Sequence, residues 1–153
     1  MAATLQLNPQ TWDLTLDEAG NIAVLADPDS LAQDAASAIK TFLGECYWDT
    51  TVGVNYAAIL GQSPPTIALL KAAFVDAALT VPGVAAAQVF ISSLSDRTVS
   101  GQVQVVSSST GQVSAANFAT NLARVVNPAA PLILVSESGD PLSSEGGEIL
   151  TSG

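Results

Sequence analysis

Two consecutive runs of β-branched residues constrain the fold of this chain more than any other feature. The runs span residues 84–94 and 98–107, and the polar residues 95–97 between them favour a turn. In the second run an apolar or glycine position alternates with a polar one: Val99, Gly101, Val103 and Val105 against Ser100, Gln102 and Gln104. This period of two predicts an antiparallel hairpin with one buried and one solvated face.

The rest of the first 110 residues predicts a second hairpin and two main helices. Residues 12–16 and 22–25 read as short strands joined by a turn that contains Gly20. Apolar residues at helical spacing predict a helix over 31–43, capped by residues 27–30, and another that begins at Ser63 and ends near Val81. We therefore expect an α+β fold: a small antiparallel sheet, made of the N-terminal hairpin and the long hairpin near 84–107, packed against two main helices.

The sequence beyond residue 107 has a weaker pattern. Four apolar residues at helical spacing predict a helix over 115–125, and residues 132–135 resemble a short strand. Residues 137–153 are rich in Gly and Ser and carry four acids and no base, which favours a flexible tail.

These patterns divide the chain into four parts. We expect an N-terminal arm over 1–11, a core over 12–110, a C-terminal extension of a helix and a strand over 111–136, and an acidic flexible tail over 137–153. A chain of 153 residues is long enough for one such domain with a tail.

The charge balance excludes several classes of function. The chain has 14 acidic and 4 basic side chains, a net charge of −10, and the scattered bases give no patch for binding nucleic acid. It has no histidine, which removes the usual general base and a common metal ligand. Cys46, the single cysteine, cannot form an internal disulfide or a thiolate zinc site, and we expect it to be a small core residue. We expect neither a catalytic centre nor a metal or cofactor.

No segment of the sequence resembles a membrane anchor. The N-terminus lacks the basic start and the apolar stretch of a secretion signal. The richest apolar region, residues 66–89, is interrupted by Lys71, Asp76 and Pro82, so it falls short of the roughly 20 apolar residues that a spanning helix needs. We expect a soluble protein without membrane contact.

Several glycines and one proline occur where the chain is expected to turn. Gly44 follows the first helix, Gly61 follows a short helical stretch over 56–60, and Gly53 lies in the bend between them. Pro82 and Gly83 separate the second helix from the long hairpin. Asp27 and Asp29 have the spacing of two calcium ligands, but the glycine that a calcium loop requires does not follow, and helix capping explains them better.

Glu45 and Asp49 form the best enzyme-like pair, because two carboxylates beside the aromatic residues Tyr47 and Trp48 resemble a glycosidase site, whose carboxyl groups lie about 5–9.5 Å apart across the scissile bond. We expect residues 45–49 to be extended, which would separate the two carboxylates by about 13 Å, beyond the range for hydrolysis. The alternative role is structural, with Glu45 acting as a local cap and Asp49 starting the next turn.

The scarcity of charge also bears on the edges of the predicted sheet. Open sheets leave unpaired backbone groups at their edges, and charged side chains usually guard them. This chain has few charges for that purpose, so strands from neighbouring subunits could pair with its edges, with residues 1–10 and 131–153 as arms. Short and twisted edges remain the alternative.

The order of segments resembles a known family. Residues 13–23, 31–45, 49–56 and 59–61, and above all the string of a helix, Gly44-Glu45, then Asp49-Thr50 and Gly53, resemble the baseplate wedge or sheath initiator family of contractile phage tails. The form is that of Mu-like myophages, with relatives in pyocin-type tails and type VI secretion baseplates. Many members carry Glu-Pro-Arg before the hairpin, whereas this chain has Val81-Pro82-Gly83, so any ion-pair role of that motif is not carried over.

The resemblance implies a structural, non-enzymatic component with a domain like the core of the sheath subunit. Its expected partners are the tail sheath protein, other baseplate wedge proteins and tail tube or hub neighbours, in six copies or a multiple, within a tail baseplate assembled in the host cytoplasm. We expect its interfaces to include six residues: Glu45, Tyr47, Trp48, Asp49, Leu132 and Ile133. A lysozyme-like glycan hydrolase using Glu45 and Asp49, or a generic adaptor of a tail or secretion complex, is the alternative.

Overall fold

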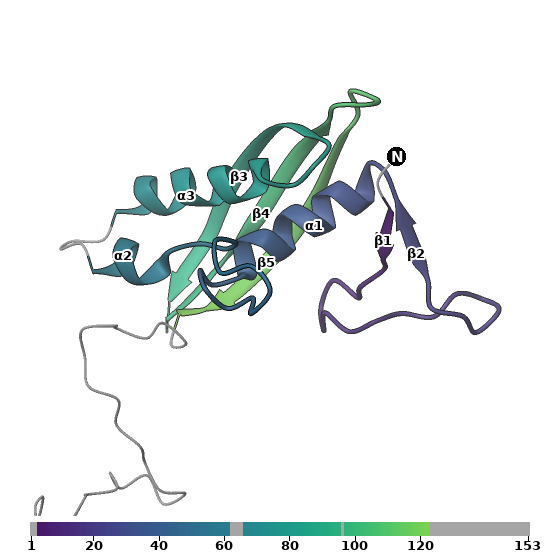
Figure 1. Cartoon of the computed structure of the whole chain (residues 1–153), viewed down its shortest axis with the longest axis horizontal. Coiled ribbons are helices and arrows are strands. Elements are labelled where there is room, and N and C mark those ends of the chain that lie inside the picture. Colours follow the sequence, from purple (N-terminus) through teal and green to yellow (C-terminus); the bar gives the residue numbers. More distant parts are fainter. Residues whose placement is uncertain (1–2, 62–65, 96, 123–153) are drawn as a thin grey trace, which may run out of the picture.

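The computed structural model describes residues 3–61, 66–95 and 97–122 (Figure 1). Its elements in chain order are β1 (Ala3–Leu5), β2 (Val24–Ala26), α1 (Asp29–Lys40), α2 (Tyr56–Leu60), α3 (Ile67–Leu79), β3 (Val84–Ser95), β4 (Thr98–Ser107) and β5 (Val113–Asn121). Small antiparallel sheets and helices together form an α+β fold, which confirms the predicted class.

The larger sheet has three antiparallel strands in the order β3-β4-β5. The predicted hairpin is confirmed, with β3 and β4 meeting at Ser95 and Thr98. The predicted alternation along β4 is also confirmed, because Val99, Gly101, Val103 and Val105 are buried, whereas Ser100, Gln102 and Gln104 are half-buried.

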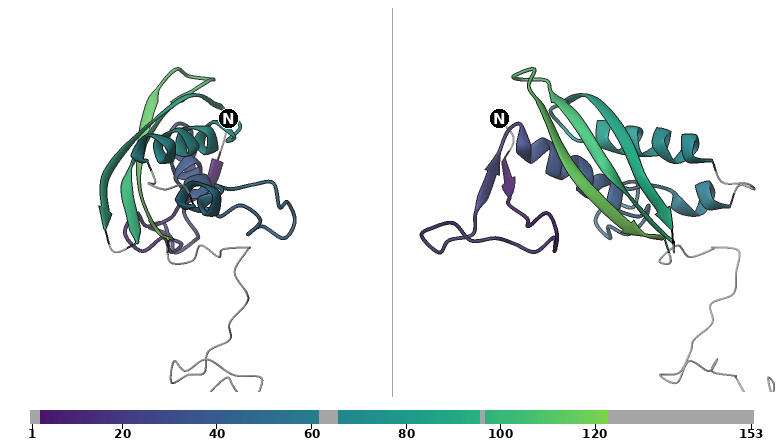
Figure 2. Two further views of the ribbon diagram at one scale, coloured as in Figure 1. Left: turned by 90° about the vertical axis from the view of Figure 1, so that its left-hand side faces the viewer. Right: turned by 180° about the vertical axis from the view of Figure 1, so that it is seen from behind.

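The helices cover one face of this sheet and enclose the core, as the end-on view in Figure 2 shows. Helix α1 packs along β4 and β5, and α3 packs on β3. Four aromatic rings cross the core in contact: Phe42 with Tyr56 at 4.7 Å between centroids, Tyr56 with Phe74 at 5.9 Å, and Phe74 with Phe118 at 5.4 Å.

The two predicted helices are present with different ends. Helix α1 begins at Asp29 and stops at Lys40, because Thr41 turns to an extended conformation and starts a loop. Helix α3 buries Leu70, Phe74 and the two alanines of its predicted stripe, but leaves Ile67 about half exposed. The predicted N-cap Ser63 lies outside the described residues.

The N-terminal strands form a separate unit, residues 3–26, beside α1 (Figures 1 and 2). The predicted hairpin is present as a single bridge from Leu16 to Ile22, while β2 pairs mainly with β1, which lies within the expected arm over 1–11. The side chain of Gln33 on α1 holds the unit: its Oε1 accepts from the N–H of Leu7 and its Nε2 donates to the carbonyl of Leu5, each at 2.8 Å.

The structure corrects the helix that the sequence predicts over 115–125. Residues 113–121 are the strand β5, whose register with β4 runs from Val113 opposite Val106 to Asn121 opposite Thr98. Phe118 and Leu122 misled the interpretation, because a spacing of four fits a helix and a strand equally well. The predicted strand over 132–135 and the tail over 137–153 lie outside the described residues.

Replacing Gly101 with Ala should destabilise the fold. A Cβ there would lie 2.1 Å from the carbonyl oxygen of Phe90 and 3.0 Å from the ring of Phe118, so the sheet would have to shift. We expect a loss of about 3 kcal/mol, at the upper end of overpacking costs, in the free energy of unfolding from urea titration. The control is Gln102→Ala on the same strand, and equal stability of both variants would contradict the analysis.

Asp34 on α1 gives a pH-dependent prediction. Burial raises the pKa of its carboxyl, and a hydrogen bond from Thr4 of β1 opposes the shift. A raised pKa in the folded state means that stability falls as the pH rises from the ordinary value of 3.8. Asp34→Asn should therefore be more stable than the parent at neutral pH, with a difference that vanishes below the ordinary pKa.

The measurement is thermal unfolding across pH. Asp13→Asn, which removes an exposed carboxylate of the neighbouring N-terminal unit, controls for the loss of one negative charge. If the gain in stability from Asp34→Asn did not change with pH, burial of the charged Asp34 carboxylate would be refuted as its cause.

Candidate partner interfaces

The loop between α1 and α2, residues 41–55, is closed at its base by backbone pairing. Phe42 and Val54 form a parallel bridge: the N–H of Leu43 donates to Val54 at 3.0 Å, and that of Val54 donates to Thr41 at 2.9 Å. Gly53 allows this approach, because its φ is +110° and a Cβ would lie 2.7 Å from the carbonyl group of Phe42. The loop therefore projects from a fixed base.

Tyr47 and Trp48 lie at the outer end of this loop. Their side chains are 89% and 72% exposed, and the rings touch edge to face at 5.0 Å between centroids. Aromatic side chains are usually at least half-buried in a chain that functions alone, and they are favoured anchors in interfaces. Nothing in the described chain covers this pair.

Glu45 and Asp49 both make hydrogen bonds within their own turns. Oε2 of Glu45 accepts from the N–H of Phe42 at 3.0 Å, and Oδ1 of Asp49 accepts from the N–H and hydroxyl of Thr51. The hydroxyl and N–H of Thr51 lower the pKa of Asp49, opposite to what a general acid requires. The segment 45–49, expected to be extended, forms turns instead, closed by the N–H of Asp49 on the carbonyl of Cys46.

The other residues singled out in turns have varied geometry. Gly44 and Gly83 have φ values of +84° and +98°, while Gly61 caps α2 with φ −72°. Pro82 lies between α3 and β3. Leu132 and Ile133 lie outside the described residues.

The strands at the edges of the three-stranded sheet carry no charged side chains. Its outer strands are β3 and β5, and none of the residues in β3, β4 and β5 is charged. Among the described residues, no further strand pairs with the outer edge of β3 or β5. The sequence missed the second edge, because β5 reads as a helix from its apolar spacing.

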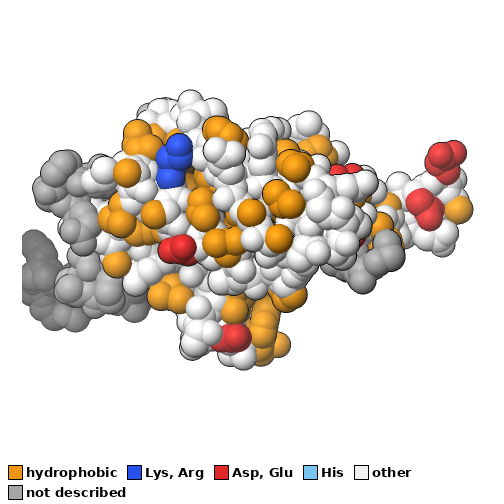
Figure 3. Space-filling view, turned by 90° about the horizontal axis from the view of Figure 1, so that it is seen from above, with side chains coloured by type: hydrophobic (Ala, Val, Ile, Leu, Met, Phe, Trp, Pro, Cys, Tyr) orange, Lys and Arg blue, Asp and Glu red, His pale blue; other side chains and the backbone are white. Residues whose placement is uncertain are grey.

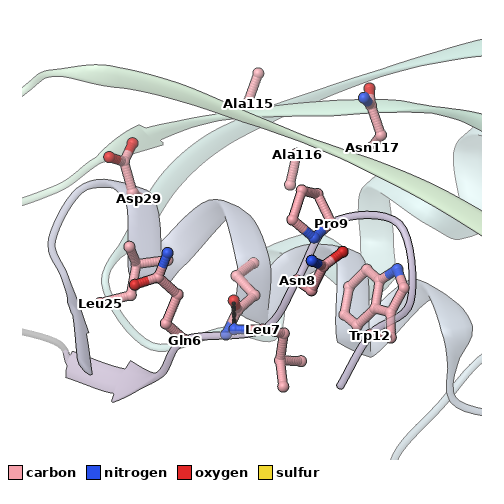
Figure 4. A pocket seen from close by; sticks show the side chains of 11 residues that line it. Gln6, Leu7, Asn8, Pro9, Trp12, Leu25, Asp29, Ala115, Ala116 and Asn117 are labelled. Carbon is pink, nitrogen blue, oxygen red and sulfur yellow. Dashed lines mark hydrogen bonds between the residues drawn. The ribbon is translucent and has the colours of Figure 1, made fainter. Parts of the chain in front are cut away.

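A groove runs along the open edge of β5, between this strand and residues 6–12 of the N-terminal unit (Figure 4). One hollow of about 230 Å³ lies against Ala115, Ala116 and Asn117, and a second of about 280 Å³ continues past Asn117 to Ala119. No signal in the sequence marks this groove, because it joins segments about a hundred residues apart.

The groove has opposite charges toward its two ends. Asp29, whose carboxylate accepts from the hydroxyl of Ser114, lines the first hollow, and Lys40 lines the second. The ammonium of Lys40 lies 3.9 Å from the centre of the Trp12 ring, and burial lowers its pKa. An extended segment seated here would meet a carboxylate at one end and an ammonium at the other.

In the described part of the chain, no three acidic, cysteine or histidine side chains come together as a metal site. Likewise, within residues 3–61, 66–95 and 97–122, no helix combines the length and apolarity needed to cross a membrane. On the face of the molecule shown in Figure 3, hydrophobic side chains are numerous and charged side chains are few.

The profile of the contractile injection system sheath initiators matches residues 3–110 of this chain. The chain belongs to the contractile injection system sheath initiator family. It is accordingly a structural component of a contractile tail, with a role in starting the sheath. The family resemblance read from the sequence is confirmed, and no curated protein sequence matches the chain. The match stops before β5, the strand that forms one open edge of this sheath initiator's sheet.

Replacing Gly53 with Ala should displace the loop of residues 41–55 of this sheath initiator, which we call the aromatic loop because it carries Tyr47 and Trp48. The added Cβ would meet Phe42 and Leu43 at the loop's base within 2.8 Å, on a backbone that L-residues rarely adopt. We expect a loss of about 2 kcal/mol or more in stability, and faster amide exchange at residues 43–54. Gly20→Ala, at φ +85° with open space around it, controls for backbone strain alone. Equal exchange rates in loop 43–54 of the two variants would contradict a role for close packing.

Proposed function

We propose that this sheath initiator starts the sheath by strand addition at the open edge of β5. The observation that carries the proposal is that this edge, free of charged residues, opens onto a groove instead of another strand. The N–H and carbonyl groups of an edge strand are a template for an incoming strand. A neighbouring sheath subunit that supplies one would extend the sheet by backbone hydrogen bonds.

The groove favours β5 over the opposite edge. An incoming strand beside β5 would lie between β5 and residues 6–12, where Pro9 and Trp12 would contact its side chains (Figure 4). The pairing of β3 with β4 has register shifts between Val84 and Ala86 and between Ile91 and Ser93, so the backbone of β3 is irregular at two points. Backbone irregularity of this kind interrupts the regular pairing that strand addition requires.

The exposed aromatic loop supports a second contact, with the baseplate wedge. Tyr47 and Trp48 would enter an apolar pocket of a wedge protein, with Glu45 and Asp49 at its rim facing basic residues. We also propose that the chain contacts the tail tube or hub neighbours, and that six copies, or a multiple of six, are arranged around the tail. Leu132 and Ile133 stay proposed contacts of the C-terminal segment. The site of action would be the tail baseplate, after assembly in the host cytoplasm.

Paired proline substitutions in β5 test strand addition. Successive N–H groups along a strand point to opposite edges, so one of Ala115→Pro and Ala116→Pro removes a bond to β4 and the other removes only a donor facing the groove. The variant that keeps every bond to β4 should be the more stable of the two, and urea unfolding identifies it. In particles whose own copy is replaced by that variant, we expect sheathed tails to fall by about tenfold in electron micrographs.

Serine at each of the two positions retains the N–H and serves as the control. Normal sheathing by the more stable proline variant would rule out pairing at this edge. Normal sheathing combined with the loss of sheath from Trp48→Ala would place the initiating contact in the aromatic loop.

A further inference from the structure

Three segments of the N-terminal unit meet in a closed ring of backbone hydrogen bonds. The N–H of Gln6 donates to the carbonyl of Ala23 at 2.8 Å, that of Ala23 donates to Thr15 at 2.9 Å, and that of Thr15 donates to Gln6 at 3.1 Å. Each segment therefore holds the other two, and the unit has a defined geometry without a core of its own.

Six aliphatic residues flank the three members of this ring, one on each side. They are Leu5 and Leu7, Leu14 and Leu16, and Ile22 and Val24. They are also partners across the pairings: Leu5 with Val24, Leu7 with Leu14, and Leu16 with Ile22. Pairing partners, and residues two apart in a strand, point to the same face. The six side chains therefore share one face, which we call the aliphatic face.

The aliphatic face points away from the rest of the molecule. The side chain of Thr4, which points to the face opposite that of Leu5, forms a hydrogen bond with Asp34 on α1. Ala23 of the ring is buried. Five members of the face are 48–67% exposed: Leu5, Leu14, Leu16, Ile22 and Val24. A group of large apolar side chains exposed together typically marks an interaction site.

The charges of the N-terminal unit that carries this face are of one sign. The charged residues between positions 3 and 26 are Asp13, Asp17 and Glu18, all exposed, and no basic residue occurs there. Two copies that met face to face would bring these carboxylates together and repel. A partner with an apolar surface bordered by Lys or Arg would meet complementary charge.

We propose that the aliphatic face binds a different protein of the contractile assembly, through an apolar surface bordered by basic residues. The side chain of Gln33 and the contact of Lys40 with Trp12 fix the unit on α1, so the face is ordered before the partner arrives. Of the six members of this face, Leu7 also lines the groove at β5, the other five do not, and none belongs to the aromatic loop. The contact therefore stands or falls independently of strand addition.

Photo-cross-linking in assembled particles tests the proposal. A benzophenone amino acid replaces Leu16 or Val24 in one set of particles, and Ile67, similarly exposed on α3, in the control. We expect both test positions, and not Ile67, to cross-link to the same protein other than this chain, at peptides containing Lys or Arg. Cross-links to a second copy, to residues 123–153 of the same chain, or to no protein would overturn it.

Substitutions on the face give a second, quantitative test. Leu16→Ser with Val24→Ser should leave the stability of the free chain nearly unchanged, since both side chains are exposed, but lower its incorporation into particles by about tenfold. Asp17→Lys with Glu18→Lys should also lower incorporation, and Ile67→Ser should not. Normal incorporation of the double serine variant would refute the proposal, and normal incorporation of the lysine variant would refute its charge component.

Discussion

The row of four aromatic rings is the interaction on which the rest of this structure depends. Phe42 comes from the base of the aromatic loop, Tyr56 from α2, Phe74 from α3 and Phe118 from β5, so one row of contacts joins the aromatic loop to the open strand of the sheet. The hydroxyl of Tyr56 donates to the carbonyl of Ile39 at the end of α1. Burial raises the pKa of Tyr56, which keeps this donor neutral, although a hydrogen bond with Thr120 opposes the shift. Offset and edge-to-face contacts of this kind stabilise the core beyond the effect of the apolar area that they bury. The loop and the sheet edge are therefore positioned by the same core.

The sequence predicts the elements whose burial alternates strongly. The β3–β4 hairpin could be read because valines alternate with serine and glutamine, and α1 and α3 because their buried faces repeat at helical spacing. Strand β5 could not be predicted, because its inward-facing residues are mostly small or polar. The spacing of Phe118 and Leu122 fits both a helix and a strand. The pairing of β1 with β2 depends on the tertiary anchor at Gln33, which no local pattern reveals. The same limit applies to the surfaces: Tyr47 and Trp48 stand out locally, whereas the groove and the aliphatic face exist only after distant segments meet.

The proposed interfaces share a physical character. Open strand edges, exposed aromatics and exposed aliphatics all contribute little to the stability of the isolated chain and gain most when a neighbour removes water from them. The chain has a net charge of −10, although no residue of β3, β4 or β5 is charged. Such a net charge disfavours association between copies before assembly and leaves the uncharged surfaces open to the correct partner. Low charge on the sheet and high charge on the whole chain are therefore compatible.

Strand β5 follows the region shared with the family, which ends at residue 110, and yet it occupies the rim of the sheet. A relative built from the shared region alone would present β4 as its rim. Adjacent strands are spaced by about 4.8 Å, so the first sheath subunit would sit one strand width nearer to α3 in such a relative than in this protein. Under the proposed strand addition, a short C-terminal addition would in this way shift the starting radius or rotation of a sheath without altering a residue of the common fold.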